Sequence, residues 1–275
     1  MKKPLFNKVC IVGVGLIGGS LGMAIKKGKL AKFVVGVVHR KKTVAEAFRK
    51  GALDGATLDL REGVRGADLV VLCGPVSVIM DQLKILSRFL DKKTIVMDVG
   101  SSKESINQVA KKYISRNIFV GCHPIAGSEK AGVQFADAAL FAKSVCFVTS
   151  SNSQVGKLWR ALGAQTVLAD PKSHDLWAAR ASHLPHLIAF ALFQDFPRPK
   201  RSVSNPSIRD FARLSKSDPE LWADIIWSNR KQISPLLNRF RGCLGRWSQV
   251  LIKGRRSKIA SFIREANNRS FYVSS

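Results

Sequence analysis

Three glycines near the start of the chain have the spacing of a phosphate-binding turn. Val9–Val12 is a short apolar run typical of a buried strand, and it leads directly into Gly13-x-Gly15-x-x-Gly18. The segment 16–27 that follows has the composition of a helix. The first glycine permits the tight turn, the second lets a pyrophosphate approach the backbone, and the third lets helix and strand pack closely. The pattern predicts a dinucleotide site, the alternative being a glycine turn with a purely structural role.

The end of the next expected strand, Phe33–Val38, indicates which dinucleotide binds. An NAD site has an acidic residue about twenty residues beyond the glycines, where it accepts hydrogen bonds from the ribose 2′-hydroxyl. Here His39-Arg40-Lys41-Lys42 follows, with no carboxylate. Cations suit a 2′-phosphate, so NADP is favoured over NAD, although a solvated basic run would look the same. The candidates for cofactor binding are Gly13, Gly15, Leu16, Ile17, Gly18, His39, Arg40 and Pro75.

Two further polar side chains follow expected strands. Ser101 comes after Thr94–Val99, and His123 comes after Asn117–Cys122. The carboxyl ends of parallel strands meet at one edge of a sheet, so both side chains are expected to face the dinucleotide. A histidine there can take a proton from a substrate hydroxyl while hydride leaves the same carbon for a nicotinamide. A histidine before Pro124 could equally anchor a turn.

The order of the expected elements changes near residue 170. Before it, short apolar strands alternate with helices, which predicts an α/β fold with a doubly wound, mostly parallel sheet of Rossmann type. After it, long helical segments at 174–193, 221–240 and 245–266 predict an all-α domain, with a polar break at 197–206. We therefore expect a dinucleotide-binding domain at 1–170 and a helical domain at 171–275. The second could bury a face against a partner subunit, because about 100 helical residues make only a modest core.

The charge of the chain is unusually positive. Lysine and arginine number 45 against 19 acidic residues, a formal charge of +26. This invites a nucleic-acid interpretation. Only Pro197–Arg201 and Lys253–Lys258 form local clusters, and neither is interleaved with aromatic residues that could stack on bases. We expect no specific nucleic-acid partner and a general attraction for anionic small molecules.

Cysteine use and hydropathy limit the compartment. The five cysteines are scattered and form no CxxC pair, which suits free thiols in a reducing cytoplasm. No run approaches 18 uninterrupted apolar residues, so no membrane span is expected. The first expected strand begins almost at once, leaving no room for a signal peptide.

Five motifs occur in order along most of the chain. The first is generic to dinucleotide-binding folds, and the other four are highly specific. They are Gly-Leu-Ile-Gly-Gly-Ser at 15–20, Asp-Val-Gly-Ser at 98–101, His-Pro-Ile-Ala-Gly-Ser-Glu-Lys at 123–130, Ser-His-Leu-Pro-His at 182–186, and Arg-Asp-Phe-Ala-Arg at 209–213 followed by Ser-Asp-Pro-Glu-Leu-Trp at 217–222. Between Lys8 and Arg230 the sequence thus resembles the prephenate/arogenate dehydrogenases of tyrosine biosynthesis.

The resemblance implies oxidative decarboxylation of prephenate to 4-hydroxyphenylpyruvate, or of arogenate to tyrosine, with hydride transfer to NAD(P) in a homodimer. It implies that His123 is the catalytic histidine at the ring 4-hydroxyl and that Ser101 helps to orient it. Arg213 would bind a substrate carboxylate, as expected for an arginine facing a dianion. The other implied pocket residues are His186, Arg209, Trp222 and Glu129, of which His186 and Trp222 could instead be core residues. Such chemistry needs no metal.

Two alternatives stay open. A β-hydroxyacid dehydrogenase-like reductase would share the glycine turn and the helical tail. Such enzymes typically place a lysine, with an asparagine four residues later, in the first long helix of the second domain, whereas here that helix carries Ser182–His186. The other is a basic, non-enzymatic Rossmann-like protein that binds nucleic acid or only the cofactor. It would not need His123 and Arg213 together.

Overall fold

The computed structural model describes residues 3–127, 130–195 and 205–270. Within it the chain forms two compact units, Met1–Arg230 and Lys231–Ser275. The first holds a sheet with its covering helices and several further helices, and the second holds two helical segments. The expected division at residue 170 stays a prediction.

Among the described residues, eight strands form one sheet in the order β3-β2-β1-β4-β5-β6-β7-β8. All neighbours are parallel except β6 and β7, which are antiparallel. From β1 the chain winds outward to β3 and then returns to build the other half from β4, which confirms the doubly wound fold. Ligands bind where this order reverses, beyond the carboxyl ends of the central strands. The strands are β1 (Phe6–Val12), β2 (Ala31–Val37), β3 (Gly55–Thr57), β4 (Leu69–Leu72), β5 (Ile95–Asp98), β6 (Ile118–Pro124), β7 (Val145–Val148) and β8 (Gln165–Leu168).

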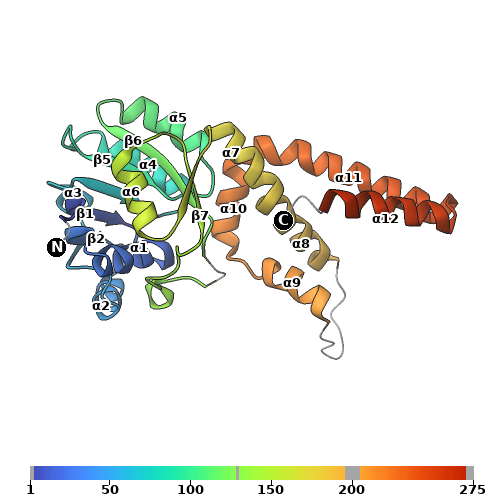
Figure 1. Ribbon diagram of the computed structural model, residues 1–275, viewed down its shortest axis with the longest axis horizontal. Coiled ribbons are helices and arrows are strands. Elements are labelled where there is room, and N and C mark those ends of the chain that lie inside the picture. Colours follow the sequence, from blue (N-terminus) through green and yellow to red (C-terminus); the bar gives the residue numbers. More distant parts are fainter. Residues whose placement is uncertain (1–2, 128–129, 196–204, 271–275) are drawn as a thin grey trace. The chain divides into compact units, whose positions relative to one another are not determined.

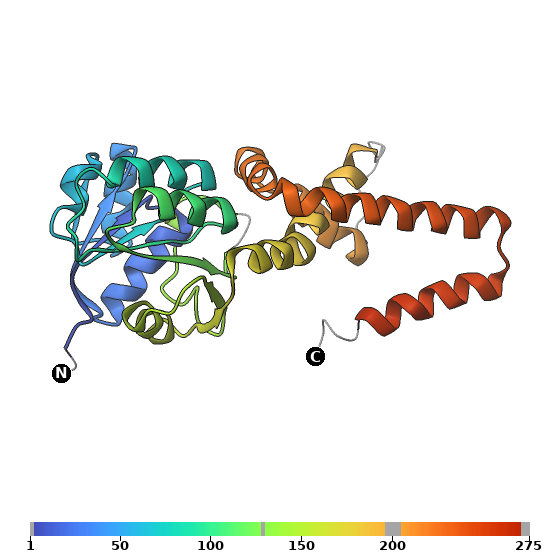
Figure 2. The ribbon, with the colours of Figure 1, turned by 90° about the horizontal axis from the view of Figure 1, so that it is seen from above.

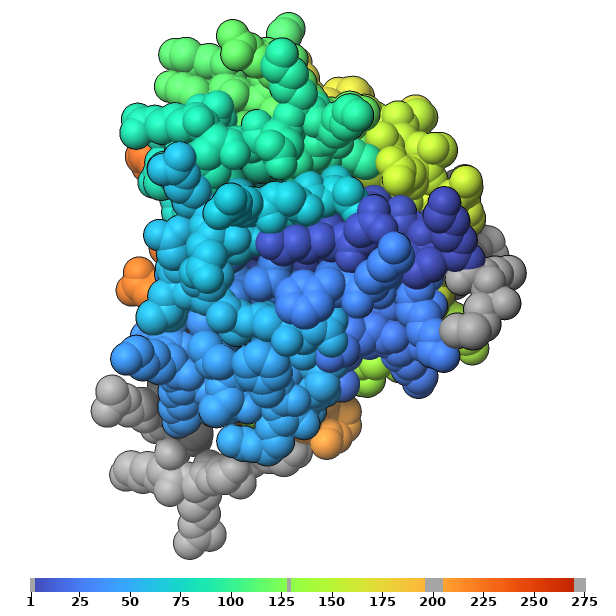
Figure 3. All heavy atoms as spheres, turned by 90° about the vertical axis from the view of Figure 1, so that its left-hand side faces the viewer, coloured from blue at the N-terminus to red at the C-terminus, as the bar shows by residue number. Residues whose placement is uncertain are grey.

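Helices cover both faces of this sheet, so its central strands are apolar on both sides (Figures 1 and 2). Leu69–Leu72, for example, is buried throughout. Figure 3 shows the left-hand side of Figure 1. The dark blue N-terminal residues lie between lighter blue residues on one side and teal and green residues on the other, as expected when β1 lies between β2 and β4 in the sheet. One face packs against α1 (Leu16–Lys27), α2 (Lys41–Arg49) and α6 (Ser153–Ala161), and the other against α3 (Leu60–Val64), α4 (Val76–Leu86) and α5 (Glu104–Tyr113).

Three later helices start with the same capping pair. Asp170, Asn205 and Asp218 each accept a hydrogen bond from a backbone N–H of the first turn, and a proline follows each of them. Proline is well suited to this position because its missing N–H is one that the helix would leave unpaired. The helices are α7 (Pro171–Ala178), α9 (Pro206–Ser215) and α10 (Pro219–Ser228).

Several expected helix boundaries are wrong. The segment 174–193 is helical throughout, as expected, but it contains a π-helical turn at Ala179–His183 between α7 and α8 (Leu184–Gln194). The segment 221–240 is divided at Asn229, where α10 ends and α11 (Arg230–Lys253) begins. The segment 245–266 is divided around Gly254, before α12 (Arg256–Ser270). The sequence interpretation also missed α9 and the short elements β3 and α3.

The second unit consists of α12 and all but the first residue of α11. Trp247 and Phe262 meet edge to face, with ring centroids 5.3 Å apart. Large apolar side chains are exposed along these helices, namely Leu237, Leu244, Leu251, Ile252 and Ile263. Among residues 3–127, 130–195 and 205–270, we find no helix with the length and hydropathy of a membrane span.

Candidate active site

The glycine turn leaves room for a ligand in front of α1. Gly13 has φ +94°, and a Cβ there would lie 2.7 Å from the carbonyl oxygen of Cys73. A Cβ on Gly18 would collide with the carbonyl oxygen of Gly13. Among the described residues, a Cβ on Gly15 would meet no atom within 4 Å, and no side chain caps the helix that begins there. Gly13 and Gly18 are thus required by packing, while Gly15 opens the helix N-terminus to an anion, which fits a dinucleotide pyrophosphate.

The other cofactor candidates lie at the carboxyl ends of three neighbouring strands. Leu16 and Ile17 open α1 after β1, and Pro75 precedes α4 after β4. His39 and Arg40 follow β2, where both are exposed and Arg40 is the residue just before α2. Since β2, β1 and β4 are adjacent in the sheet, these residues share one edge at the reversal of strand order.

His123 is held by a histidine that the sequence interpretation left without a partner. It lies within β6 rather than after it, because that strand runs on to Pro124. Its Nδ1 lies 2.9 Å from Nε2 of His174 in α7. Nδ1 of His174 lies 2.8 Å from Oδ1 of Asp175. The structure therefore joins His123 to two residues that were not candidates.

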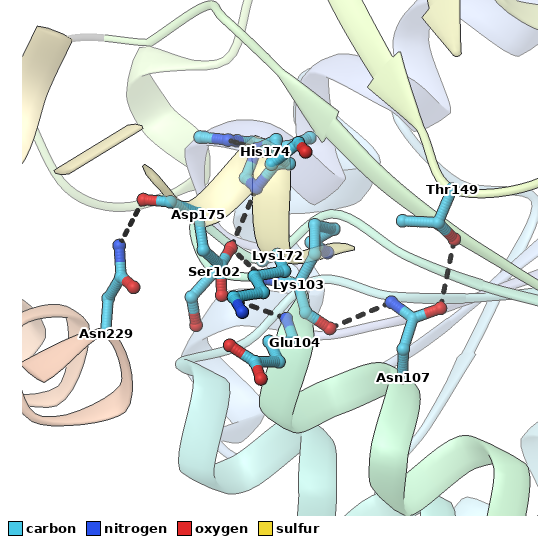
Figure 4. A network of polar contacts seen from close by, with 12 residues as sticks. Ser102, Lys103, Glu104, Asn107, Thr149, Lys172, His174, Asp175 and Asn229 are labelled. Carbon is cyan, nitrogen blue, oxygen red and sulfur yellow. Dashed lines mark hydrogen bonds and ion pairs between the residues drawn. The ribbon is translucent and has the colours of Figure 1, made fainter. Parts of the chain in front are cut away.

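Asp175 is fixed by the backbone at the start of α5. Its Oδ1 accepts a hydrogen bond from the backbone N–H of Lys103 at 2.6 Å, and its Oδ2 accepts one from Glu104 at 2.9 Å (Figure 4). Its own carbonyl accepts a hydrogen bond from the side-chain amide of Asn229, at 2.8 Å. The His174-Asp175 pair follows the Asp170-Pro171 cap after two intervening residues in the sequence, but no sequence pattern connects it to His123.

A buried ion pair ties the ends of β5 and β6 together. The Lys103 ammonium contacts the carboxylate of Asp98, the last residue of β5, and donates a hydrogen bond to the carbonyl of Cys122 at 2.7 Å. Both side chains are fully buried. Burial raises the pKa of the Asp98 carboxyl, and the Lys103 charge opposes that rise. Ser101 lies in the loop between these partners, so it follows the strand adjacent to that of His123.

Removing this ion pair should destabilise the fold strongly. Lys103→Met leaves the Asp98 carboxylate buried and unpaired, and breaking a buried pair typically costs about 3–5 kcal/mol. We expect the free energy of unfolding, measured by urea denaturation, to fall by that amount. Exposed Lys111→Met on α5, the helix that Lys103 precedes, is the control and should change it little. Equal stability of the two variants would show that the buried pair does not contribute.

His123 is kept neutral by its surroundings. Burial is the largest cause that lowers its pKa well below the ordinary histidine value, followed by His174, Lys103 and His183. The imidazole is therefore unprotonated at pH 7, and its lone pair is available to accept a proton from a substrate.

A second cluster gathers three of the pocket candidates. The rings of His186 and Trp222 are stacked, with centroids 3.5 Å apart. Nδ1 of His186 donates a hydrogen bond to the Ser182 carbonyl at 2.9 Å. Burial lowers the pKa of His186, the Ser182 carbonyl raises it, and the positive charge of Arg213 lowers it.

The remaining candidates are less defined. Arg209 and Arg213 are exposed and lie one turn apart on α9. Glu129 lies outside the described residues.

His183 links the cluster around Asp175 to the cluster around Trp222. Its Nδ1 lies 3.0 Å from the amide of Asn229, and its ring lies edge-on to Trp222, with ring centroids 6.0 Å apart.

The doubly wound sheet with a glycine turn at its reversal point defines a nucleotide-binding protein of Rossmann type. Residues 21–168 match the family model of the prephenate dehydrogenase nucleotide-binding domain, and residues 170–265 match that of the prephenate dehydrogenase dimerization domain. The chain belongs to the prephenate dehydrogenase family.

Individual relatives agree with this assignment. The prephenate dehydrogenase of Lactococcus lactis is 29% identical over 268 residues, which cover 94% of this chain and 75% of that protein. The structure of prephenate dehydrogenase from A. aeolicus, in complex with hydroxyphenyl propionate and NAD+, has a TM-score of 0.88 at 26% identity and covers 98% of both chains. The structure of Synechocystis arogenate dehydrogenase has a TM-score of 0.79 at 26% identity, covering 96% of this chain and 99% of that one.

Proposed function

We propose that this enzyme catalyses the oxidative decarboxylation of prephenate or arogenate with transfer of hydride to NADP. The observation that carries the proposal is the position of His123 at the end of β6, on the same edge of the sheet as the glycine turn, in surroundings that lower its pKa. The family assignment over residues 21–265 supports this reaction over that of a β-hydroxyacid dehydrogenase.

The proton balance assigns two tasks to His123. When bound, the nicotinamide supplies the hydride acceptor. Nε2 of His123 takes the proton of the ring 4-hydroxyl as the hydride leaves C4. The resulting dienone is conjugated to the carbon that bears the ring carboxylate, so loss of carbon dioxide restores an aromatic ring as a phenolate. His123 then returns its proton to that oxygen, and no net proton is released.

The substrate carboxylates require cations from the helical segments. Arg213 pairs with a carboxylate through its planar guanidinium, which binds an anion in two hydrogen bonds. His186, Arg209 and Trp222 line the same pocket, with the stacked His186–Trp222 pair as an apolar wall for the ring. Ser101 orients His123 and the substrate. Glu129 contacts the substrate side chain that distinguishes prephenate from arogenate.

The preference for NADP rests on the end of β2. Val38 stands where an NAD enzyme presents a carboxylate, and it is buried at 2% exposure. The exposed Arg40 at the start of α2 is our first choice for the contact with a 2′-phosphate, since no carboxylate stands there to repel it.

Substitutions at these two positions should separate the cofactors. Arg40→Ala should raise KM for NADP by roughly 10-fold, the loss of one charge-assisted contact, and leave NAD almost unchanged. Val38→Asp should shift kcat/KM toward NAD. Exposed Arg61→Ala on α3 is the matched control. Steady-state kinetics with both cofactors decides, and a wild-type preference for NAD would overturn the assignment.

We also propose that the enzyme is a homodimer of the cytoplasm. The second unit exposes Leu244, Leu251 and Ile252, which a partner chain would cover. Its residues up to 265 lie in the part that matches the family's dimerization domain. The five cysteines are free thiols, as in a reducing compartment. The cofactor-binding domain would comprise residues 1–170 and the helical domain 171–275.

The experiment that tests the reaction measures reduction of NADP and of NAD, each with prephenate and with arogenate. We expect turnover with at least one of the two substrates and higher kcat/KM with NADP. Failure of both substrates with both cofactors would contradict the proposal.

A further inference from the structure

The hydrogen-bond directions around Asp175 can be worked out from its partners. Two backbone N–H groups, of Lys103 and Glu104, point at its carboxylate, one to each oxygen. A backbone N–H can only donate, so the carboxylate accepts both. The start of α5 also favours negative charge through the helix dipole. Both oxygens of Asp175 therefore act as acceptors, and its third polar neighbour is placed to donate to it.

That third neighbour is Nδ1 of His174, at 2.8 Å. A neutral imidazole has one N–H and one bare nitrogen, so donation from Nδ1 leaves Nε2 of His174 as an acceptor. Nε2 lies 2.9 Å from Nδ1 of His123, which donates to it when His174 is neutral. The same rule leaves Nε2 of His123 without a proton, and its lone pair is free for the substrate.

The groups around the two imidazoles can be taken in turn, starting with Asn229 and His183. The Asn229 amide donates to the Asp175 carbonyl, so the same NH₂ group faces Nδ1 of His183 and donates to it. Burial lowers the pKa of His183 to about 4, and His183 is therefore neutral at pH 7. Of the described charged groups near His123, Lys103 is paired with Asp98, and the Asp175 carboxylate lies at the far end of the chain of hydrogen bonds.

We propose that His174 and Asp175 are positioning residues that hold His123 in the tautomer with a proton on Nδ1 and a free lone pair on Nε2. This rests on the proposed role of His123 as the base. The balanced reaction returns the proton of His123 to the substrate oxygen. The chain of hydrogen bonds from His123 through His174 to Asp175 therefore has no proton to carry to solvent. Its task is to fix one tautomer and one ring orientation, as the carboxylate partner of a catalytic histidine does.

Two amide substitutions separate the two hydrogen bonds of His174. In His174→Asn the amide lies near the position of Nδ1, so it reaches Asp175 but not His123. In His174→Gln the amide lies near the position of Nε2, so its oxygen can accept the proton on Nδ1 of His123. We expect kcat to fall about 100-fold in the Asn variant, and to stay within about 10-fold of wild type in the Gln variant, with small changes in KM, the range seen for supporting partners of a ligand histidine.

Thr149→Val is the control for structural damage near His123. The Thr149 hydroxyl accepts a hydrogen bond from the Gly121 N–H and donates one to Asn107, both at 3.0 Å, and neither partner is His123, His174 or Asp175 (Figure 4). This variant should lower Tm but keep kcat near wild type. Equal kcat in the Asn and Gln variants would overturn the proposal.

A spectroscopic measurement decides the tautomer without any activity assay. In ¹⁵N-histidine-labelled wild-type protein, the His123 signals, assigned by their loss in His123→Asn, should show a protonated Nδ1 and a bare Nε2 at pH 7.5. A proton on Nε2 would overturn the proposal even in an active enzyme. If instead the wild type oxidises neither substrate, the proposed function fails, and the tautomer is still determined independently.

Discussion

Replacing His123 with asparagine is expected to lower kcat by about 10²–10⁴-fold, with a smaller change in KM, because general-base catalysis typically contributes that much. Asparagine can still form hydrogen bonds to a substrate hydroxyl but cannot take its proton. Cofactor binding should be unaffected, since His123 lies beyond the strands that carry the glycine turn. Equilibrium titration with NADP checks this, and single-substrate kinetics measures kcat. A variant with near-normal kcat would remove His123 from catalysis.

The pH profile of the wild type follows from the same group. The reaction needs neutral His123, and its surroundings lower its pKa well below the usual value of 6.5. As pH falls through 6.5, the imidazole therefore stays neutral and kcat should hold, declining only at distinctly lower pH. A kcat that halves near pH 6.5 through titration of His123 would contradict the geometry around this residue.

The second large effect is expected at Arg213. Losing a charge-assisted pair with a substrate carboxylate should cost about 1.5–3 kcal/mol, or roughly 10–150-fold in kcat/KM, in Arg213→Ala. Arg213→Lys should recover only part of this, because an ammonium cannot offer the planar fork of a guanidinium. Exposed Lys216→Ala, just beyond the end of α9, removes one positive charge nearby and is the control. Equal kcat/KM in wild type and both Arg213 variants would exclude Arg213 from the pocket.

The parts of the structure that were predictable are those governed by local pattern. The glycine spacing at 13–18 follows from steric limits that act within one turn, and the structure shows the crowding at Gly13 and Gly18 that demands glycine. The apolar runs of β4 and β5 are strands because helices bury them from both sides. Both features can be derived from composition and period alone.

The parts that were missed depend on contacts between distant segments. The hydrogen bond between His123 and His174 joins residues 51 positions apart, and no spacing rule connects them. The division of the segment 221–240 at Asn229 has the same origin, because the buried Asn229 amide donates to the carbonyl of Asp175, 54 positions away. The Asn205-Pro206 pair is a signal for the start of α9. This helix was missed because the whole segment 197–206, including Pro206, was interpreted as a break.

The central claim is tested most directly by the stoichiometry of turnover. With prephenate and NADP, or with arogenate if that is the substrate used, the enzyme should release one carbon dioxide for each NADPH formed. The product should be an aromatic ring that keeps its para hydroxyl, measured against an enzyme-free blank. Reduced cofactor without carbon dioxide would instead indicate simple alcohol oxidation and contradict the account.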